Sequence, residues 1–390
     1  MNIEARVDED CGRRTRLLMM VPHLGGGGAE RVMARLAAGL ARDAFDVHFA
    51  VFADDSPGAE ALPEWMMLHR LEAGRVRWAA WKMLRLIWQV RPELIVTGMM
   101  HVSAMVLMLR PWMPRGTRIA VRVNTTVSRS MTGGLERRVY GLLLRRADGV
   151  ICQSAAMAED VIAHLGVDGS RVAVARNPVD VARICAEARV ARQQRMEPRD
   201  GIHVVCVGRL SAEKGVDLLL DAWGLLIDRL GAEGTQMKLT IAGEGKERQR
   251  LEAMAARPGM AASVSFCGYA QDVSSWLGWA DICVQPSRHE GMPNALLEAA
   301  AAGLALVATP SSEGVVELLR GDAGAWVASG INAEALADAM RMAIDAVWER
   351  RSARLGGDEF AHPFLEPFEH EAALQSWERC LKEICAEKRR

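Results

Sequence analysis

The chain has 390 residues, a length that favours two or three domains over one. Half of the residues are hydrophobic, a quarter are charged and the formal net charge is −1, as in an ordinary soluble globular protein. A near-neutral chain without a recognisable nucleic-acid-binding module argues against nucleic acid as a partner.

The amino-terminal residues 1–8 are polar and acidic, so we expect no secretory signal there. No stretch of the sequence approaches the roughly 20 apolar residues of a membrane span. The eight cysteines are scattered, several of them inside strand-like runs, which indicates buried reduced thiols and a reducing compartment.

A first series of predicted strands begins at residues 16–21, a short apolar run that ends at Pro22. Four glycines follow, and residues 30–40 then have helical spacing. Strand, glycine loop and helix in this order are typical of the opening of a Rossmann-like unit. The other strand-like runs of the series are 47–52, 94–97, 119–123 and 149–152.

The four glycines of this loop are Gly25, Gly26, Gly27 and Gly28. They lack side chains where a phosphate or a sugar would have to approach the backbone. A run of four glycines also suits a flexible linker. Its position between a strand and a helix favours a binding site.

Residues 75–88 are basic and rich in tryptophan, with helical periodicity. Two interpretations stay open: the stretch lies in a bilayer interface with its apolar face down, or it packs on the core and exposes a basic side. An anionic acceptor or membrane surface fits the charge of this half, because residues 1–180 carry a net charge of +5 and the rest −6. The aromatic and basic residues of the stretch are Trp78, Trp81, Trp88, Arg75, Arg77, Lys82 and Arg85.

A second series of strands follows a polar stretch, residues 181–200, and we place the domain junction after Asp180. Regular alternation of strands and helical stretches predicts, in each half, a parallel sheet with helices on both faces. The strand-like runs of the second series are 202–207, 238–242, 264–267, 282–285 and 304–308.

Charged residues and glycines collect where strands of the second series end. Gly208-Arg-Leu-Ser-Ala-Glu-Lys-Gly215 follows the first strand, and Glu290-Gly-Met-Pro-Asn-Ala-Leu-Leu-Glu298 follows the fourth. Ligands of doubly wound sheets bind outside the carboxyl ends of the strands. Helix starts there favour anions through free backbone N–H groups and the helix dipole. The arrangement predicts a site for a sugar nucleotide.

Glu298 is predicted to lie inside a buried helix. Pro293 suits the first position of that helix, and residues 295–306 are almost entirely apolar. A buried carboxylate needs hydrogen-bonding partners, and ribose hydroxyls could supply them.

These motifs resemble those of the retaining family-four (group 1) GT-B nucleotide-sugar glycosyltransferases. Further matches are Gly25-Gly-Gly-Gly-Ala-Glu-Arg31, Asn177-Pro-Val-Asp180 and Ala242-Gly-Glu-Gly245, so the resemblance covers most of the chain. It implies an α/β GT-B fold with two Rossmann-like doubly wound domains that face a central cleft. Residues 1–180 would form the N-terminal acceptor-side domain and residues 181–364 the C-terminal nucleotide-sugar-binding domain. A last helix, at about 365–390, would pack back on the first domain.

Two positions depart from the family pattern. Glu313-Gly314 stands where paired glycines are usual, and Asn177-Pro178 stands in place of Asn-Gly. These changes do not affect the residues that are expected to bind the nucleotide, and they leave the sugar specificity open.

The resemblance also implies roles for single residues. Arg209 and Lys214 would stabilise the departing diphosphate, and Glu290 would position the sugar and stabilise its developing positive charge. Glu298 would bind the ribose hydroxyls. His101 would lie beside the donor sugar, with a packed or solvated histidine as an equal alternative. The other residues of the donor-binding set are Gly25, Gly26, Gly27, Gly28, Gly243, Gly245, Tyr269, Met292, Asn294 and Ala295.

Some residues of this donor-binding set also fit a structural role that involves no ligand. Gly243 and Gly245 also fit a simple tight turn. Tyr269 either stacks on the nucleobase or has a surface or packing role.

No metal and no other cofactor is expected. No cluster of His, Asp and Glu has metal-ligand spacing, and the Asp-x-Asp metal motif of other glycosyltransferases occurs only as Asp8-Glu-Asp10, in the polar tail.

The resemblance implies that the chain transfers a hexosyl unit, with retention, from a nucleoside-diphosphate sugar (UDP favoured) to a hydroxyl of a glycan or lipid-linked glycan. Cell-surface polysaccharide assembly in the cytoplasm, or at the inner face of the membrane, is the expected setting. The alternatives are a nucleotide-sugar 2-epimerase and a catalytically silent subunit that binds a sugar nucleotide.

Overall fold

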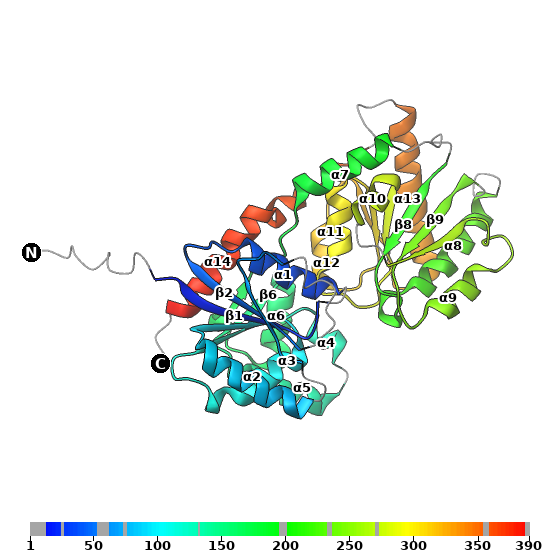
Figure 1. Ribbon diagram of the computed structural model, residues 1–390. Coiled ribbons are helices and arrows are strands. Elements are labelled where there is room, and N and C mark those ends of the chain that lie inside the picture. Colours follow the sequence, from blue (N-terminus) through cyan, green and yellow to red (C-terminus); the bar gives the residue numbers. More distant parts are fainter. Residues whose placement is uncertain are drawn as a thin grey trace, which may run out of the picture. The chain divides into compact units, whose positions relative to one another are not determined.

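The computed structural model describes residues 13–24, 27–52, 62–72, 76–131, 133–194, 201–231, 236–269, 273–353 and 359–386. The chain divides into two compact units, here called unit 1 and unit 2 (Figure 1). Unit 1 consists of residues 1–178 and 374–390, and unit 2 of residues 179–373.

Unit 1 is built on a seven-stranded parallel sheet with the order β3-β2-β1-β4-β5-β6-β7. The strands are β1 (Thr15–Val21), β2 (Phe45–Val51), β3 (Met67–Arg70), β4 (Leu94–Thr97), β5 (Arg118–Arg122), β6 (Gly149–Cys152) and β7 (Val172–Val174). The central strands are buried along nearly their whole length, as expected where both faces of a parallel sheet are covered. The order changes direction at β1, which pairs with β2 on one side and β4 on the other.

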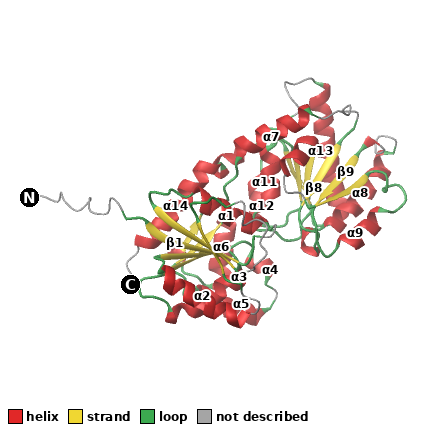
Figure 2. Ribbon diagram, viewed as in Figure 1, coloured by secondary structure: helices red, strands yellow, loops and turns green. Residues whose placement is uncertain are grey.

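Helices cover both faces of the unit 1 sheet (Figure 2). One face packs on α2, α3, α5 and α6, and the other on α1 and α14. The helices are α1 (Gly28–Gly39), α2 (Val76–Val90), α3 (Met100–Leu109), η2 (Arg110–Trp112), α4 (Val127–Ser130), α5 (Gly134–Leu144), α6 (Ala155–Leu165), η3 (Gly169–Arg171) and α14 (His370–Ala386).

The last helix, α14, joins unit 1 across a long separation in sequence. Leu374 and Trp377 are buried in the core with the strands of unit 1. The indole Nε1 of Trp377 donates to the carbonyl oxygen of Arg176 at 2.9 Å, and the N–H of Ala41 donates to Glu378 Oε1 at 2.8 Å.

Unit 2 is built on a six-stranded parallel sheet with the order β10-β9-β8-β11-β12-β13. The strands are β8 (His203–Val207), β9 (Lys238–Ala242), β10 (Val264–Gly268), β11 (Ile282–Gln285), β12 (Ala305–Ala308) and β13 (Ala325–Val327). The helices are α7 (Val181–Gln193), η4 (Ala212–Lys214), α8 (Val216–Leu230), α9 (Arg248–Ala255), α10 (Val273–Trp279), α11 (Asn294–Ala301), α12 (Glu313–Leu319), α13 (Ala333–Ser352) and η6 (Pro363–Phe368).

Helix ends in both units carry the residues that local chemistry favours. The Ser154 hydroxyl caps α6 by accepting from the N–H of Met157, and Gly166 ends this helix in the left-handed region at φ +61°. Asn332 caps α13 in the same way.

The predicted fold class, two Rossmann-like doubly wound domains, is confirmed by these two parallel sheets. The polar stretch after Asp180 is the helix α7, whose Ala188 packs closely against Gly278 of α10. In unit 2 the strand order changes direction between β8 and β11, and the loops that follow these two strands carry the motifs singled out in the sequence.

Candidate active site

The loop after β8 presents Lys214 at the carboxyl end of the unit 2 sheet. The short helix η4 ends at Lys214, and Gly215 follows in the left-handed region at φ +66°. A Cβ atom on Gly215 would lie 2.1 Å from the carbonyl oxygen of Pro286, so only glycine fits this close approach to the next loop. Arg209, the other predicted cation, is exposed in the same loop.

Two predicted glycines hold this loop from the other side. A Cβ atom on Gly243 would lie 1.8 Å from the carbonyl oxygen of Gly208, and one on Gly245 would lie 2.1 Å from that of Leu210. The N–H of Leu210 donates to the carbonyl oxygen of Glu244 at 2.9 Å. The close contact between the two loops therefore explains why both positions are glycine. Their part in donor binding stays a prediction.

Glu290 is held by three donors in the loop after β11. Its Oε1 accepts from Lys214 Nζ at 2.5 Å, from Ser287 Oγ at 2.8 Å and from Gln285 Nε2 at 3.0 Å. The Glu290 side chain is only 10% exposed, and that of Lys214 is 28% exposed. The structure thus brings together two predicted catalytic residues that lie 76 positions apart in the chain.

Gln285, Ser287 and Thr309 also belong to this site, although the sequence did not predict them. Thr309 Oγ1 donates to the carbonyl oxygen of Ser287 at 2.5 Å. This contact holds Ser287, whose hydroxyl donates to Glu290. The available signal was Gln285, a polar residue at the end of an otherwise apolar strand. Such a residue needs a buried partner, and that partner is Glu290.

Glu298 is buried in α11, as we predicted, with only 8% of its surface exposed. The prediction that Pro293 takes the first helical position is wrong by one residue, because α11 begins at Asn294 and the carbonyl of Pro293 accepts from the N–H groups of Leu296 and Leu297. Asn294 and Ala295 occupy the first two helical positions. The ribose role of Glu298 remains a prediction.

Two other predicted donor-binding residues of unit 2 differ in their surroundings. The Met292 side chain is buried in the core beside α7 and α11. Tyr269 follows β10 and is 51% exposed. Exposure leaves the aromatic ring free to stack on a flat ligand, and burial limits Met292 to contacts through its backbone.

In unit 1 the predicted residues lie after β1 and β4. Gly28 opens α1, and a Cβ atom on Gly27 would lie 1.9 Å from Glu30 Oε2. His101 is exposed in the first turn of α3. Gly25, Gly26, Arg75, Asp8 and Asp10 lie outside the described residues.

A buried polar cluster at the carboxyl ends of β5 and β6 was also missed. Arg122 donates to Asn177 Oδ1 at 2.8 Å and to Asn124, and the Asn177 amide donates to Gln153 Oε1 at 3.2 Å. Burial lowers the pKa of Arg122 to about 9, and the charge of Glu30 opposes this shift. Arg122 lies inside a run that we interpreted as an apolar strand, so spacing alone gave no sign of the cluster.

The described residues contain no group of three or more His, Cys, Asp and Glu side chains arranged to hold a metal ion.

Two family models match this chain. The model described as "Glycosyltransferase Family 4" matches residues 26–183, and the one described as "Glycosyl transferases group 1" matches residues 201–346. A glycogen synthase of Mycobacterium tuberculosis is 32% identical over 231 residues, which are 57% of this chain and 53% of the relative. The chain thus spans about half the length of that relative. A lipopolysaccharide core biosynthesis glycosyltransferase of Rhizobium meliloti is 29% identical over 68% of this chain and 74% of the relative.

The fold is also that of solved structures, among them glycosyltransferases. The Anabaena protein HepE, crystallised in complex with UDP-glucose, superimposes with a TM-score of 0.79 at 18% identity, over 95% of this chain and 100% of that chain. The two family models cover both units, and the sheets, the relatives and the structural likeness agree with them. The chain therefore belongs to the family-four, group 1 glycosyltransferases and has their GT-B fold.

Proposed function

We propose that the chain is a retaining hexosyltransferase that works without a metal and uses a nucleoside-diphosphate sugar, with UDP favoured. The single observation that carries the proposal is the contact between Lys214 Nζ and Glu290 Oε1 at the carboxyl end of the unit 2 sheet. Ligands of such sheets bind at this edge. The UDP-glucose complex of the HepE structure supports the choice of donor.

The two cations of the loop after β8 act on the leaving group. A diphosphate gains negative charge as the sugar departs, and fixed positive charges at its oxygens stabilise that charge in the transition state. Lys214 is fixed by its contact with Glu290, whereas Arg209 is exposed and can turn its guanidinium fork toward phosphate oxygens.

Glu290 acts on the sugar. Three hydrogen-bond donors hold its carboxylate in one orientation. The carboxylate therefore loses little further conformational freedom when the sugar nucleotide binds. A carboxylate in this position stabilises the positive charge that develops on the ring as the diphosphate leaves, while the acceptor attacks from the same face. Glu298 accepts from the ribose hydroxyls.

The acceptor is a hydroxyl of a glycan or lipid-linked glycan. The name of the Rhizobium relative, in lipopolysaccharide core biosynthesis, supports this class. Trp81 and Trp88 on α2 are 58% and 48% exposed, although the opposite side of the helix packs on the core through Met83 and Ile87. Exposed tryptophans beside Lys82 and Arg85 suit the surface of an anionic membrane.

The setting we propose is the cytoplasmic face of that membrane. None of the helices in the described part of the chain is long and apolar enough to cross a bilayer. Every cysteine in that part is a free thiol, as expected in a reducing compartment.

A panel of nucleoside-diphosphate sugars tests the function, with released nucleotide as the readout because this needs no acceptor. We expect release from at least one donor, UDP-linked, and unchanged release in excess EDTA. Conversion of the donor to an epimeric sugar nucleotide would identify a 2-epimerase instead. Binding without release or transfer would identify a silent subunit, and loss of activity in EDTA with recovery in magnesium would overturn metal independence.

A further inference from the structure

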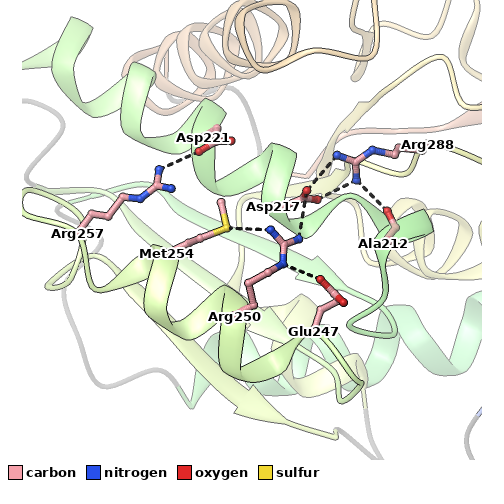
Figure 3. Close-up of polar contacts among 8 residues, drawn as sticks. All are labelled: Ala212, Asp217, Asp221, Glu247, Arg250, Met254, Arg257 and Arg288. Atoms are coloured by element: carbon pink, nitrogen blue, oxygen red, sulfur yellow. Dashed lines mark hydrogen bonds and ion pairs between the residues drawn. The ribbon is translucent and has the colours of Figure 1, made fainter.

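The two loops that carry Lys214 and Glu290 are tied together by a third side chain, Arg288. Arg288 lies two residues before Glu290, and its guanidinium holds Asp217 with two parallel contacts, Nη1 to Oδ1 at 2.8 Å and Nη2 to Oδ2 at 3.0 Å (Figure 3). Asp217 lies three residues after Lys214. Paired contacts of this kind fix orientation as well as distance.

Arg288 also holds the turn that ends in Lys214. Its Nη1 donates to the carbonyl oxygen of Ala212 at 2.8 Å, and its backbone N–H donates to that of Glu213 at 2.8 Å. The turn η4 consists of Ala212, Glu213 and Lys214. Two of its three carbonyl groups therefore accept from Arg288.

The far side of the same turn is anchored through Arg250. Its Nη2 lies 3.3 Å from Asp217 Oδ2, and its Nε donates to Glu247 Oε2 at 2.7 Å. The N–H of Glu247 donates to the carbonyl oxygen of Leu210 at 3.1 Å. Although burial alone would raise the pKa of Asp217, hydrogen bonding and charge from Arg288 hold it below its usual value, so this carboxyl is ionised at neutral pH.

The chain contains a comparison pair whose aspartate lies on the same helix as Asp217, α8. Arg257 contacts Asp221 at 3.0 Å, one turn further along α8 than Asp217, and both side chains are about half exposed (Figure 3). This pair has the same chemistry but no contact with either loop of the site. The variant Arg257→Ala therefore controls for the loss of an exposed arginine–aspartate contact to α8.

We propose that Arg288 is a positioning residue, which sets Lys214 against Glu290 by clamping the turn η4 to the loop after β11. The inference rests on the proposed function, because it acts through the contact of Lys214 with the leaving diphosphate. Displacement of a reacting group by about 1 Å can cost on the order of 10²-fold in rate. Loss of the clamp is therefore expected to lower kcat more than it raises KM.

The test measures nucleotide release in four variants, Arg288→Ala, Arg288→Lys, Asp217→Asn and the control Arg257→Ala, with Tm as a measure of folding. We expect Arg288→Ala and Asp217→Asn to lower kcat about tenfold or more, and Arg257→Ala to leave it unchanged. Arg288→Lys restores part of the loss, because an ammonium supplies charge but no planar fork. Equal turnover of Arg288→Ala and Arg257→Ala would overturn the clamp.

A double-mutant cycle separates positioning from general support of the fold. If Arg288 acts through Lys214, Arg288→Ala has little further effect on kcat in a Lys214→Ala background. A fall of the same size in both backgrounds would overturn the inference. If Lys214→Ala alone leaves release unchanged, the proposed function fails instead. If Arg288→Ala does not fold, the same cycle is measured with Asp217→Asn, in the unmodified chain and in the Lys214→Ala background. A fall in kcat of the same size in both backgrounds would again overturn the inference.

Discussion

Lys214 and Glu290 form an ion pair whose partners are both more than two-thirds buried, and this differs from the many exposed pairs of the chain. Exposed pairs contribute little because water and salt screen them. The Lys214 ammonium, by contrast, has a fixed position beside a carboxylate that two further donors hold. Such a fixed charge can act on a leaving group without reorganisation at the moment of reaction.

Replacement of Lys214 by Ala is expected to lower kcat/KM for the donor by on the order of 10²-fold, because the charge that stabilises the leaving diphosphate is lost. Steady-state release of nucleotide measures the effect. Lys246→Ala is the matched control, since Lys246 is an exposed lysine of the neighbouring loop. Near-normal turnover in a folded Lys214→Ala variant would remove Lys214 from the site.

Replacement of Glu298 by Gln is expected to weaken binding of the nucleoside diphosphate about tenfold, with a smaller effect on folding. A carboxylate can accept from two ribose hydroxyls, whereas an amide has a single acceptor oxygen, and a hydrogen bond to a charged group contributes about 1.5–3 kcal/mol. Calorimetric titration measures the change. Glu334→Gln, an exposed helical glutamate, serves as the control, and unchanged affinity in Glu298→Gln would contradict the ribose role.

At the scale of elements, burial in the strands of both sheets protects cysteine thiols from chemical modification. Cys152 in β6, Cys206 in β8 and Cys283 in β11 are buried. Burial raises the pKa of Cys152 and of Cys206 to about 12, and it raises the pKa of Cys283 as well. The reactive thiolate is therefore scarce at pH 8 in the folded chain.

Alkylation by iodoacetamide at pH 8 should accordingly leave these three thiols unmodified in the native chain and modify them in denaturant, where the pKa returns to its ordinary value. Peptide mass spectrometry reports each site. Cys185, which is half-buried on α7, is the internal comparison and should react first. Native-state modification of Cys206 at the rate of Cys185 would contradict this account.

Most of the strands that the sequence could predict are largely buried, although the edge strand β10 is not. All ten predicted strands exist, because a strand covered on both faces needs an unbroken apolar run. The three missed strands, β3, β7 and β13, lie at sheet edges, have half-exposed residues and are only 3 or 4 residues long, so each gives only a short pattern. The helix α7 escaped prediction because its sequence is polar overall.

The site could be predicted only in part for a related reason. Motif positions place Lys214 and Glu290 at the ends of strands, but strand order decides which loops meet, and the sequence gives no direct signal of that order. The partners Gln285 and Ser287, the clamp residue Arg288 and the buried Arg122 depend on the direction in which a side chain points. The contacts of Gln285 and Ser287 lie at the end of β11 and in its loop, whereas those of Arg288 and Arg122 join segments that follow different strands.

At the scale of the whole molecule, the exposed tryptophans of α2 predict where the protein works. We expect it to bind anionic vesicles at low salt and to release them as salt rises, because each basic residue near such a surface contributes on the order of 1 kcal/mol and is screened by ions. Co-sedimentation at two ionic strengths measures this binding.

The double variant Trp81→Ala and Trp88→Ala should stay in the supernatant. Trp348→Ala is the matched control, because Trp348 is also exposed but belongs to unit 2. Binding that persists unchanged in the double variant would exclude α2 as the membrane surface, and a supernatant location at both ionic strengths would favour a soluble acceptor.

The packing of α14 on unit 1 has a consequence for folding during synthesis on the ribosome. Unit 2 is one continuous segment, whereas unit 1 lacks the helix that carries Leu374 and Trp377 until residues 179–373 have been made. At about 5–20 residues per second, that interval lasts roughly 10–40 s. Throughout it, the face of the first-made sheet that packs on α14 is covered by α1 alone, so the half that is synthesised second is the first that can finish folding.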